Sequence, residues 1–186
     1  MIFEMIFHAV CVTLERQQMS SVISVGLTPL SKAIQTEMGG FPVHFYDKLL
    51  AYRNSMGLAR DMGIRILEIR EGYAKSEMLI NASQQNLIGS VHGGILMTFA
   101  DIVGAAAAWS YGTYTTTMNC SVNFLNAAIN VDRLWAEAQV EKRGKQTIVA
   151  RVVITDSTGR KILVSTFSFF SLGKPIELDD PGGTTA

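Results

Sequence analysis

The longest helical pattern in this chain covers residues 93–111 and is almost entirely apolar. Residues 104–108 within it read Gly-Ala-Ala-Ala-Ala, so part of the helix presents only small side chains. A helix that is apolar on nearly every side cannot rest with one face in water and has to be buried. Small side chains also allow other backbone to approach closely, as a sheet curled around one helix requires. The pattern therefore predicts a central helix that the rest of the domain wraps.

After Gly112 the hydrophobic period changes to two, which is typical of strands with one buried face. In the first of these segments Met118, Cys120, Val122 and Phe124 alternate with polar residues. Turn-forming sequences at residues 142–145 and 156–159 predict tight hairpins between the later segments. The four predicted strands lie at residues 117–124, 134–141, 148–154 and 162–170.

The segments before the long helix predict a short helix at residues 47–60, a hairpin at residues 64–80 and a loop at residues 82–91. Because no helix separates the later strands, the order indicates an α+β domain with an antiparallel sheet rather than a doubly wound one. We assign this domain to residues 46–172. Residues 1–45 lack a periodic core and form a leader of uncertain order, and residues 173–186 are predicted to be disordered.

Composition excludes several classes of partner for this chain of 186 residues. Lys and Arg together number 16, as do Asp and Glu, so a net charge of zero with no basic stripe disfavours nucleic acid. The apolar stretches at residues 1–14 and 95–109 are too short to span a bilayer, which argues against a membrane protein. Cys11 and Cys120 are far apart and fit reduced thiols in a cytoplasmic protein.

The stretch that carries chemistry is residues 86–101, NLIGSVHGGILMTFAD. Gly93 and Gly94 stand where the long helix begins, and a helix start offers free N–H groups and the positive end of a dipole. Asp101 lies two turns into the apolar helix, where a carboxylate is costly unless it is satisfied or used. Together they predict a site that polarises an electrophile beside a base or nucleophile.

The chain resembles the hotdog-fold acyl-CoA thioesterases of the phenylacetate-pathway type. The resemblance rests on the element order, on Asn86, on the His-Gly-Gly of residues 92–94, on Asp101, and on residues 122–125 and 143–145. It covers about residues 47–172 and implies a curved antiparallel sheet wrapped around a long central helix. It also implies hydrolysis of an acyl-CoA thioester to a free acid and coenzyme A, with no metal or other cofactor.

Five residues are candidates for catalysis, each with a plainer alternative. The resemblance makes Asp101 a nucleophile or a base, although a buried Asp can be purely structural. It makes Gly93 an oxyanion donor and Asn86 a second donor, although both can simply shape the loop. His92 is more typical of a loop-ordering residue than of a base. Thr117 matches a family position that orients water, or is an ordinary strand threonine.

Gly94, Arg143, Gly144 and Lys145 are candidates for substrate binding. Arg143 and Lys145 could contact the phosphates of coenzyme A, although turn charges are usually only solvated. The acyl pocket is expected to involve side chains such as Trp109, Tyr111 and Phe124, and aromatic, medium-chain and hydroxylated acyl groups all remain open. His8, His44 and His92 with the two cysteines show no metal-ligand spacing.

The spacing along the helix has a consequence for assembly. Gly93 and Asp101 are eight residues apart, or about 12 Å along a helix, which is too far for one carbonyl to contact both. Two subunits with antiparallel helices could bring the helix start of one to the Asp of the other. We therefore expect a homodimer or a dimer of dimers with active sites at the subunit interface. Two other functions remain open: a non-catalytic acyl-CoA sensor, and a hotdog hydratase or dehydratase.

Overall fold

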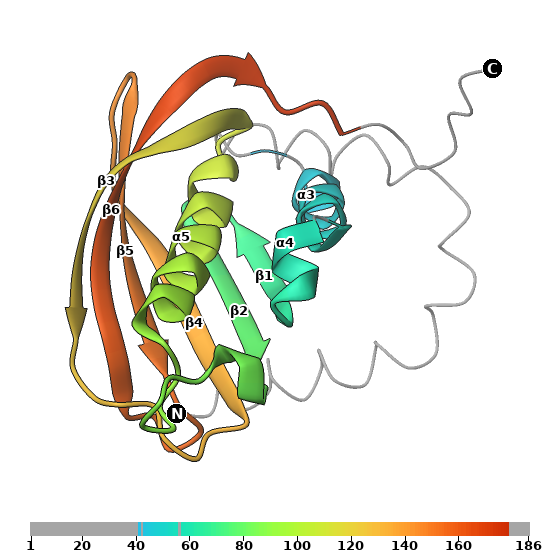
Figure 1. The fold of residues 1–186 in the computed structure, drawn as a ribbon. Coiled ribbons are helices and arrows are strands. Elements are labelled where there is room, and N and C mark those ends of the chain that lie inside the picture. The colour runs from blue at the N-terminus through green and yellow to red at the C-terminus, as the bar shows by residue number, and fades with distance from the viewer. Residues whose placement is uncertain (1–40, 42, 56, 179–186) are drawn as a thin grey trace, which may run out of the picture. The chain divides into compact units, whose positions relative to one another are not determined.

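The computed structural model describes residues 41, 43–55 and 57–178, and these form a curved antiparallel sheet around one long helix (Figure 1). The sheet order is β1-β2-β4-β5-β6-β3, and every neighbouring pair is antiparallel. The predicted α+β hotdog fold is confirmed. The strands are β1 (Ile64–Arg70), β2 (Tyr73–Leu79), β3 (Thr113–Phe124), β4 (Arg133–Arg143), β5 (Thr147–Thr155) and β6 (Lys161–Pro175).

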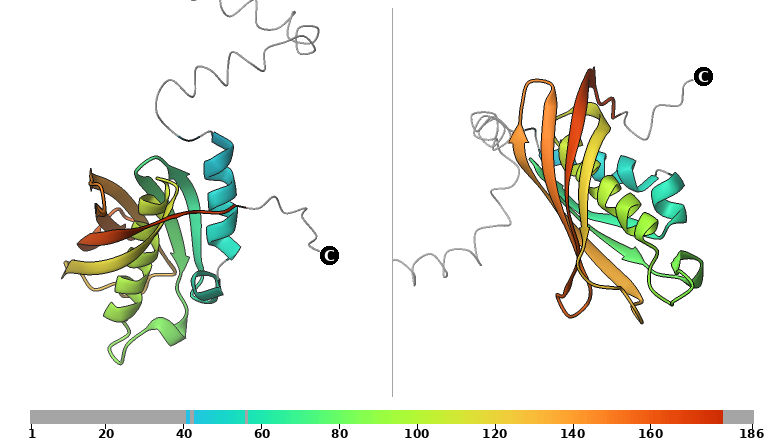
Figure 2. Two further views of the ribbon diagram at one scale, coloured as in Figure 1. Left: turned by 90° about the horizontal axis from the view of Figure 1, so that it is seen from above. Right: turned by 60° about the vertical axis from the view of Figure 1, so that its left-hand side comes forward.

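Helix α5 (Gly93–Trp109) lies on the concave side of the sheet, as both views in Figure 2 show. Phe99 and Val103 on this helix are fully buried. A Cβ added at Gly104 would lie 3.1 Å from the ring of Phe169 and 3.3 Å from Val152, so a larger residue would push the sheet away. The small-residue run thus does what its sequence predicts, which is to let the sheet approach the helix.

One side of α5 is not covered by this chain. Asp101, Ile102 and Ala105 are only half-buried, and Met97 is exposed. The expectation that Asp101 is a buried carboxylate is therefore wrong for the single chain. The reason is geometric, because the sheet covers only its own side of α5 and leaves the side that carries Met97 and Asp101 outside.

The N-terminal helical segment is longer than predicted and is divided in two. Helix α3 (Val43–Ser55) starts four residues before the predicted start at residue 47, and α4 (Gly57–Asp61) follows it. Leu49 on α3 is fully buried. Beyond the predicted hairpin of β1 and β2, a single 3-10 turn, η1 (Ala82–Gln84), begins the loop that leads to α5.

The C-terminal end of the domain lies further along the chain than predicted. Strand β6 continues to Pro175, and the N–H of Ile176 donates to the carbonyl of Gly112 at 3.0 Å. Ile176 is 8% exposed, so its side chain belongs to the core. The prediction of disorder from residue 173 is therefore wrong for residues 173–178. Of the predicted leader, residues 1–40 lie outside the described part of the chain.

Candidate active site

The start of α5 has one backbone donor in use and one available. His92 is the N-cap, and its Nδ1 accepts a hydrogen bond from the N–H of Gly94 at 3.0 Å. A neutral His92 therefore carries its proton on Nε2. Within the described residues the N–H of Gly93 has no hydrogen-bond partner and remains free to bind a ligand oxygen. The loop-ordering role expected of His92 matches this geometry.

Asn86 is held in a fixed orientation by its own loop. Its Oδ1 accepts hydrogen bonds from the N–H groups of Ile88 and Ser90, both at 3.1 Å. The backbone of Asn86 also pairs with Ser90 and Gly89, at 2.8 and 3.0 Å. Because the amide oxygen is occupied, the group that Asn86 can offer to a ligand is its Nδ2 donor. Asn86 is therefore suited to binding an oxygen rather than to abstracting a proton.

Asp101 and Thr117 come from different elements and are in direct contact. The hydroxyl of Thr117, on β3, donates to Oδ1 of Asp101, on α5, at 2.7 Å. Thr117 is exposed and Asp101 is half-buried, so the pair is accessible. The hydrogen bond fixes one carboxylate oxygen and leaves Oδ2 able to accept a proton or attack a carbon. The structure thus places in direct contact two residues that the sequence analysis gave as separate candidates.

The five candidate catalytic residues form two groups, not one. A cavity of about 290 Å³ includes Gly93 and a second of about 550 Å³ includes Asn86 and His92. Neither cavity is lined by Asp101 or Thr117. Gly93 and Asp101 are separated by about 12 Å of helix. In one chain, Gly93, Asn86 and His92 at the start of α5 and in the loop before it are therefore separated from the pair of Asp101 and Thr117. We call the first set the oxygen-binding half and the second the carboxylate half, after the roles expected of them.

Arg53 is a charged residue near Asp101 that the sequence analysis missed. It is 8% exposed, its Nη2 donates to the carbonyl of Ile102 at 2.8 Å, and its guanidinium lies 4.5 Å from the centre of the Trp109 ring. Burial lowers the pKa of Arg53 to about 10, while the charge of Asp101 acts in the opposite direction. The guanidinium is therefore charged at neutral pH. Arg53 is four residues after Leu49, which is fully buried, so both lie on the same face of α3. This spacing is the signal in the sequence that could have indicated that Arg53 faces the core.

The candidate phosphate-binding residues lie at the other end of α5 from Gly93. Arg143, Gly144 and Lys145 line a cavity of about 440 Å³ together with Tyr111 and hydroxyl-bearing residues. The Arg143 guanidinium lies 4.3 Å from the centre of the Tyr111 ring. A Cβ on Gly144 would lie 2.9 Å from the carbonyl oxygen of Thr147, so the turn needs glycine there.

The described residues contain no group of three His, Cys, Asp or Glu side chains placed to hold a metal ion. None of the helices in the described part of the chain is both long and apolar enough to cross a membrane.

Comparison with known proteins identifies the family. Residues 88–163 match the family model of the thioesterase superfamily. The chain is 35% identical over 104 residues to the acyl-coenzyme A thioesterase PaaI of Escherichia coli. The matched region covers 56% of this chain and 74% of that protein. The solved structure of E. coli PaaI, from the phenylacetic acid degradation operon, matches with a TM-score of 0.67 and 29% identity over 71% of this chain and 99% of that one.

A hypothetical thioesterase protein of Streptococcus pneumoniae, solved with coenzyme A, matches with a TM-score of 0.58 and 29% identity over 61% of this chain and 91% of that one. Two variants of that protein have also been solved, one with an Asp replaced by Ala and one with a Thr sixteen positions later replaced by Ala. Asp101 and Thr117 are sixteen positions apart as well. The chain belongs to the hotdog-fold thioesterase family, among the PaaI-type acyl-CoA thioester hydrolases.

Proposed function

We propose that this protein hydrolyses acyl-CoA thioesters in active sites that each combine residues of two subunits. Gly93 and Asn86 of one subunit bind the thioester oxygen, and Asp101 with Thr117 of the other acts on the carbonyl carbon. The observation that carries the proposal is the hydrogen bond between Asp101 and Thr117, which lies on the uncovered side of α5 and apart from the oxygen-binding half. Pairing two chains is the simplest way to bring the halves together.

The surfaces around the carboxylate half support this pairing. Met118 on β3 is 57% exposed, and Met97 on α5 is 37% exposed. Strand β3 is an edge strand with no neighbour on its outer side within the described residues. Antiparallel pairing of two β3 strands satisfies this edge, buries the apolar side chains and places the two α5 helices side by side. The antiparallel arrangement brings Gly93 of one subunit towards Asp101 of the other.

The chemistry follows from the roles of the two halves. The free N–H of Gly93 and the Nδ2 of Asn86 donate to the thioester oxygen as it gains negative charge, and the positive end of the α5 dipole adds to this stabilisation. In one route Asp101 takes a proton from a water molecule that attacks the carbonyl carbon. The carbon–sulfur bond then breaks, the sulfur of coenzyme A receives a proton, and a carboxylic acid is released.

In a second route Asp101 attacks the carbon itself and coenzyme A leaves, so that water must then hydrolyse an anhydride. Single-turnover hydrolysis in water labelled with ¹⁸O distinguishes the two routes. The nucleophilic route transfers label to the carboxylate of Asp101 when water attacks the Asp side of the anhydride. The general-base route places label only in the released acid.

We assign the coenzyme A phosphates to the cavity that Arg143 and Lys145 line. Two cations at the mouth of a cavity of this kind suit an anionic ligand. Gly144 keeps the turn compact, and Gly94, whose N–H binds His92, holds the helix start open for the substrate. Because α5 runs antiparallel in the two subunits, the phosphate cavity of one subunit lies on the side of the helix start of the other.

Release of free thiol from a panel of acyl-CoA esters tests the activity. We expect the wild-type protein to release thiol, and Asp101→Asn to lower kcat at least about 10³-fold while it still binds the ester. Asp61→Asn, at an exposed position in α4, is the matched control and should retain activity. Binding of every ester without thiol release by the wild-type protein would instead support a sensor.

Mixing two inactive variants tests whether the sites are shared. Asp101→Ala removes the carboxylate, and Gly93→Pro removes the N–H at the first helical position, where proline is tolerated. Random exchange makes half of the dimers mixed, and each mixed dimer has one intact site if sites are shared. We then expect about a quarter of the wild-type activity. Activity no higher than that of either variant alone would contradict shared sites.

A further inference from the structure

We propose that the cavity beside Gly93 binds the acyl group, that Phe124 is the side chain that limits its size, and that the preferred substrates carry an uncharged, apolar acyl group. The inference rests on the proposed function and goes further, because it names the substrate class.

The position of the cavity relative to Gly93 determines what can enter it. A thioester oxygen bound by the free N–H of Gly93 places the carbonyl carbon at the cavity mouth, with coenzyme A on one side and the acyl group on the other. The cavity has a volume of about 290 Å³, at the lower limit of small-molecule sites. That volume accommodates an acyl group of modest length but not the much larger coenzyme A.

The inner wall of the cavity is apolar and belongs to the rigid core. Val91 and Leu96 are each 3% exposed, and Ala128 is 1% exposed. Buried side chains of this kind do not rearrange easily, so they give the cavity a fixed shape. Leu125 and Ala127 complete the wall on the solvent side.

Phe124 differs from the other wall residues because its ring lies directly against Gly93. It is 52% exposed, and its ring lies so close to the start of α5 that a Cβ at Gly93 would be 3.3 Å from it. The ring therefore stands beside the predicted position of the thioester. A ring at the mouth of the cavity therefore limits the length and width of the acyl group that can enter.

The described residues that line the cavity include no charged side chain that could pair with a charged acyl group. Among the described residues, Ser90 and Asn126 are the only ones with polar side chains that line it, and Nδ2 of Asn126 already donates to the carbonyl of Lys161 at 2.8 Å. The nearby Arg160 donates to the carbonyl of Ala127 but is paired with Asp156 at 2.9 Å and does not line the cavity. A carboxylate at the end of an acyl group would therefore lose water on entering the cavity and meet no cationic side chain among the lining residues.

Of the three aromatic residues expected near the acyl group, only Phe124 lines this cavity. Trp109 lies at the far end of α5, where its ring stacks with Tyr52 at 6.4 Å. Tyr111 lies beneath Arg143 in the candidate phosphate cavity. In a single chain Trp109 and Tyr111 lie away from this cavity, because the helix separates them from Gly93 by almost its full length.

Two substitutions that change the size of the cavity in opposite directions test the inference. Phe124→Ala opens the mouth, and Ala127→Phe, at an exposed position, fills it. We expect the ratio of kcat/KM for octanoyl-CoA to kcat/KM for butyryl-CoA to rise about 10-fold in the first variant and to fall about 10-fold in the second. The wild-type protein should prefer hexanoyl-CoA to succinyl-CoA by at least about 100-fold. Leu79→Ala, which removes a similarly exposed side chain elsewhere, should leave the ratio unchanged.

Binding to the Asp101→Asn protein provides a readout that does not depend on turnover. Calorimetry should show hexanoyl-CoA binding at least about 10-fold more tightly than coenzyme A alone, with this gain lost in Ala127→Phe. If Ala127→Phe changed the affinity for all esters and for coenzyme A itself equally, the cavity would bind the coenzyme A part of the substrate, and the inference would be overturned. An unchanged chain-length ratio in both variants would also overturn it, whereas absence of thiol release with every ester would overturn only the proposed function.

Discussion

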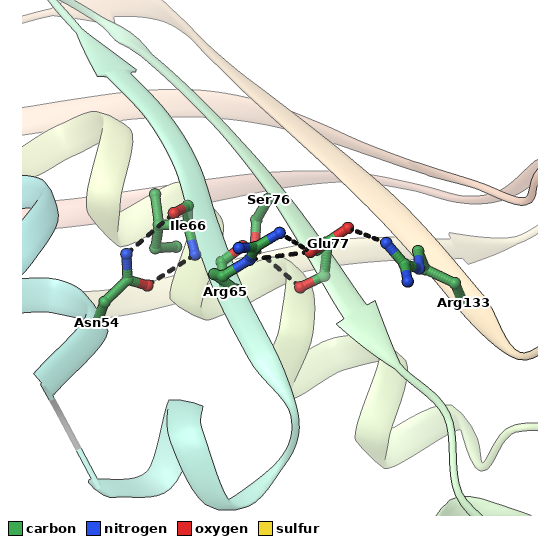
Figure 3. Close-up of polar contacts among 6 residues, drawn as sticks. All are labelled: Asn54, Arg65, Ile66, Ser76, Glu77 and Arg133. Atoms are coloured by element: carbon green, nitrogen blue, oxygen red, sulfur yellow. Dashed lines mark hydrogen bonds and ion pairs between the residues drawn. The ribbon is translucent and has the colours of Figure 1, made fainter.

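The two edge strands of the sheet, β1 and β3, differ in whether this chain supplies partners for their outer backbone groups. At the β1 edge, the side chain of Asn54 on α3 binds the backbone of Ile66 twice, donating to its carbonyl at 3.0 Å and accepting from its N–H at 2.8 Å (Figure 3). These are the groups that another strand would otherwise use. At the β3 edge no element of the described chain plays this part. The side chain of Asn54 thus takes the place of a neighbouring strand at the β1 edge. The β3 edge has no such partner and is free to pair with another strand.

The closed edge is also joined to its neighbours by charge. Glu77 on β2 accepts from Arg65 on β1 at 2.6 Å and from Arg133 on β4 at 2.6 Å, so one carboxylate connects three strands (Figure 3). No ion pair in the described residues involves β3. The edge that carries Thr117 is therefore the one that this chain does not complete by itself. The closed edge is thus stabilised within the chain, whereas the open edge is the surface to which we assign assembly and catalysis.

The largest effect is expected from a charge placed on the open edge. Met118→Asp introduces a carboxylate at a 57% exposed position of β3, and across a two-fold axis it would face the corresponding charge of the partner. We expect monomers and a loss of thioesterase activity of at least about 10³-fold, because each site needs both subunits. Size-exclusion chromatography with light scattering and thiol release measure the two effects.

A matched control separates assembly from folding. Leu79→Asp places the same charge at a similarly exposed position, 51%, on β2. This variant should keep both the dimer and the activity, and both variants should keep the far-UV circular dichroism of the wild type. Full activity of a monomeric Met118→Asp protein would contradict the composite site.

An intermediate effect is expected from opening the closed edge. Asn54→Ala removes both hydrogen bonds to Ile66 and leaves a partly buried N–H and carbonyl without partners. We expect the free energy of unfolding to fall by about 1–3 kcal/mol, as measured by urea denaturation. Ser55→Ala, which removes an exposed hydroxyl from the same end of α3, is the control and should change stability by less than about 0.5 kcal/mol.

Thioesterase activity of the Asn54→Ala protein at low temperature should remain near that of the wild type, because Asn54 lies at the opposite edge from Thr117. A loss of activity as large as that of Met118→Asp would contradict the division of roles between the edges.

The central helix and the four strands after it could be predicted from the sequence. Local patterns carry that information: the small residues of α5, the period of two in β3, and the turn at residue 144. The spacing of Gly93 and Asp101 also leads to the proposal of two half-sites in one chain, which the mixing experiment tests. Each of these depends on residues that are near one another in sequence or on a single element.

The features that the sequence did not reveal depend on contacts between distant elements. Asn54 reads as an ordinary polar residue near the end of a helix, and only the position of α3 beside β1 makes it an edge cap. Arg53 next to it reads as a surface charge until the packing against Trp109 places it inside. Asp101 appeared buried because the whole helix is apolar, whereas the apolar excess of α5 belongs in part to a surface that this chain leaves uncovered.

The smallest effect is expected from Glu77→Gln, which tests the charge network of the closed edge through pH. The hydrogen bond from Arg65, with a further contribution from Arg133, lowers the pKa of Glu77 from the ordinary 4.5 despite its desolvation. Because the pKa is lower in the folded state, the stabilisation is present above about pH 4.5 and is lost as the pH falls through the folded-state pKa. Glu77→Gln should therefore be less stable than the wild type at pH 7, and the difference should shrink on acidification.

The difference at pH 7 should be at most about 1 kcal/mol, because the side chains of Arg65 and Arg133 remain 67% and 40% exposed and water screens their charges. Urea denaturation of both proteins from pH 7 down to pH 3 measures it. A difference that stays constant over this range would show that Glu77 acts by packing and not by charge. Dimer formation should be unaffected at pH 7, because the open edge contains none of the three charges.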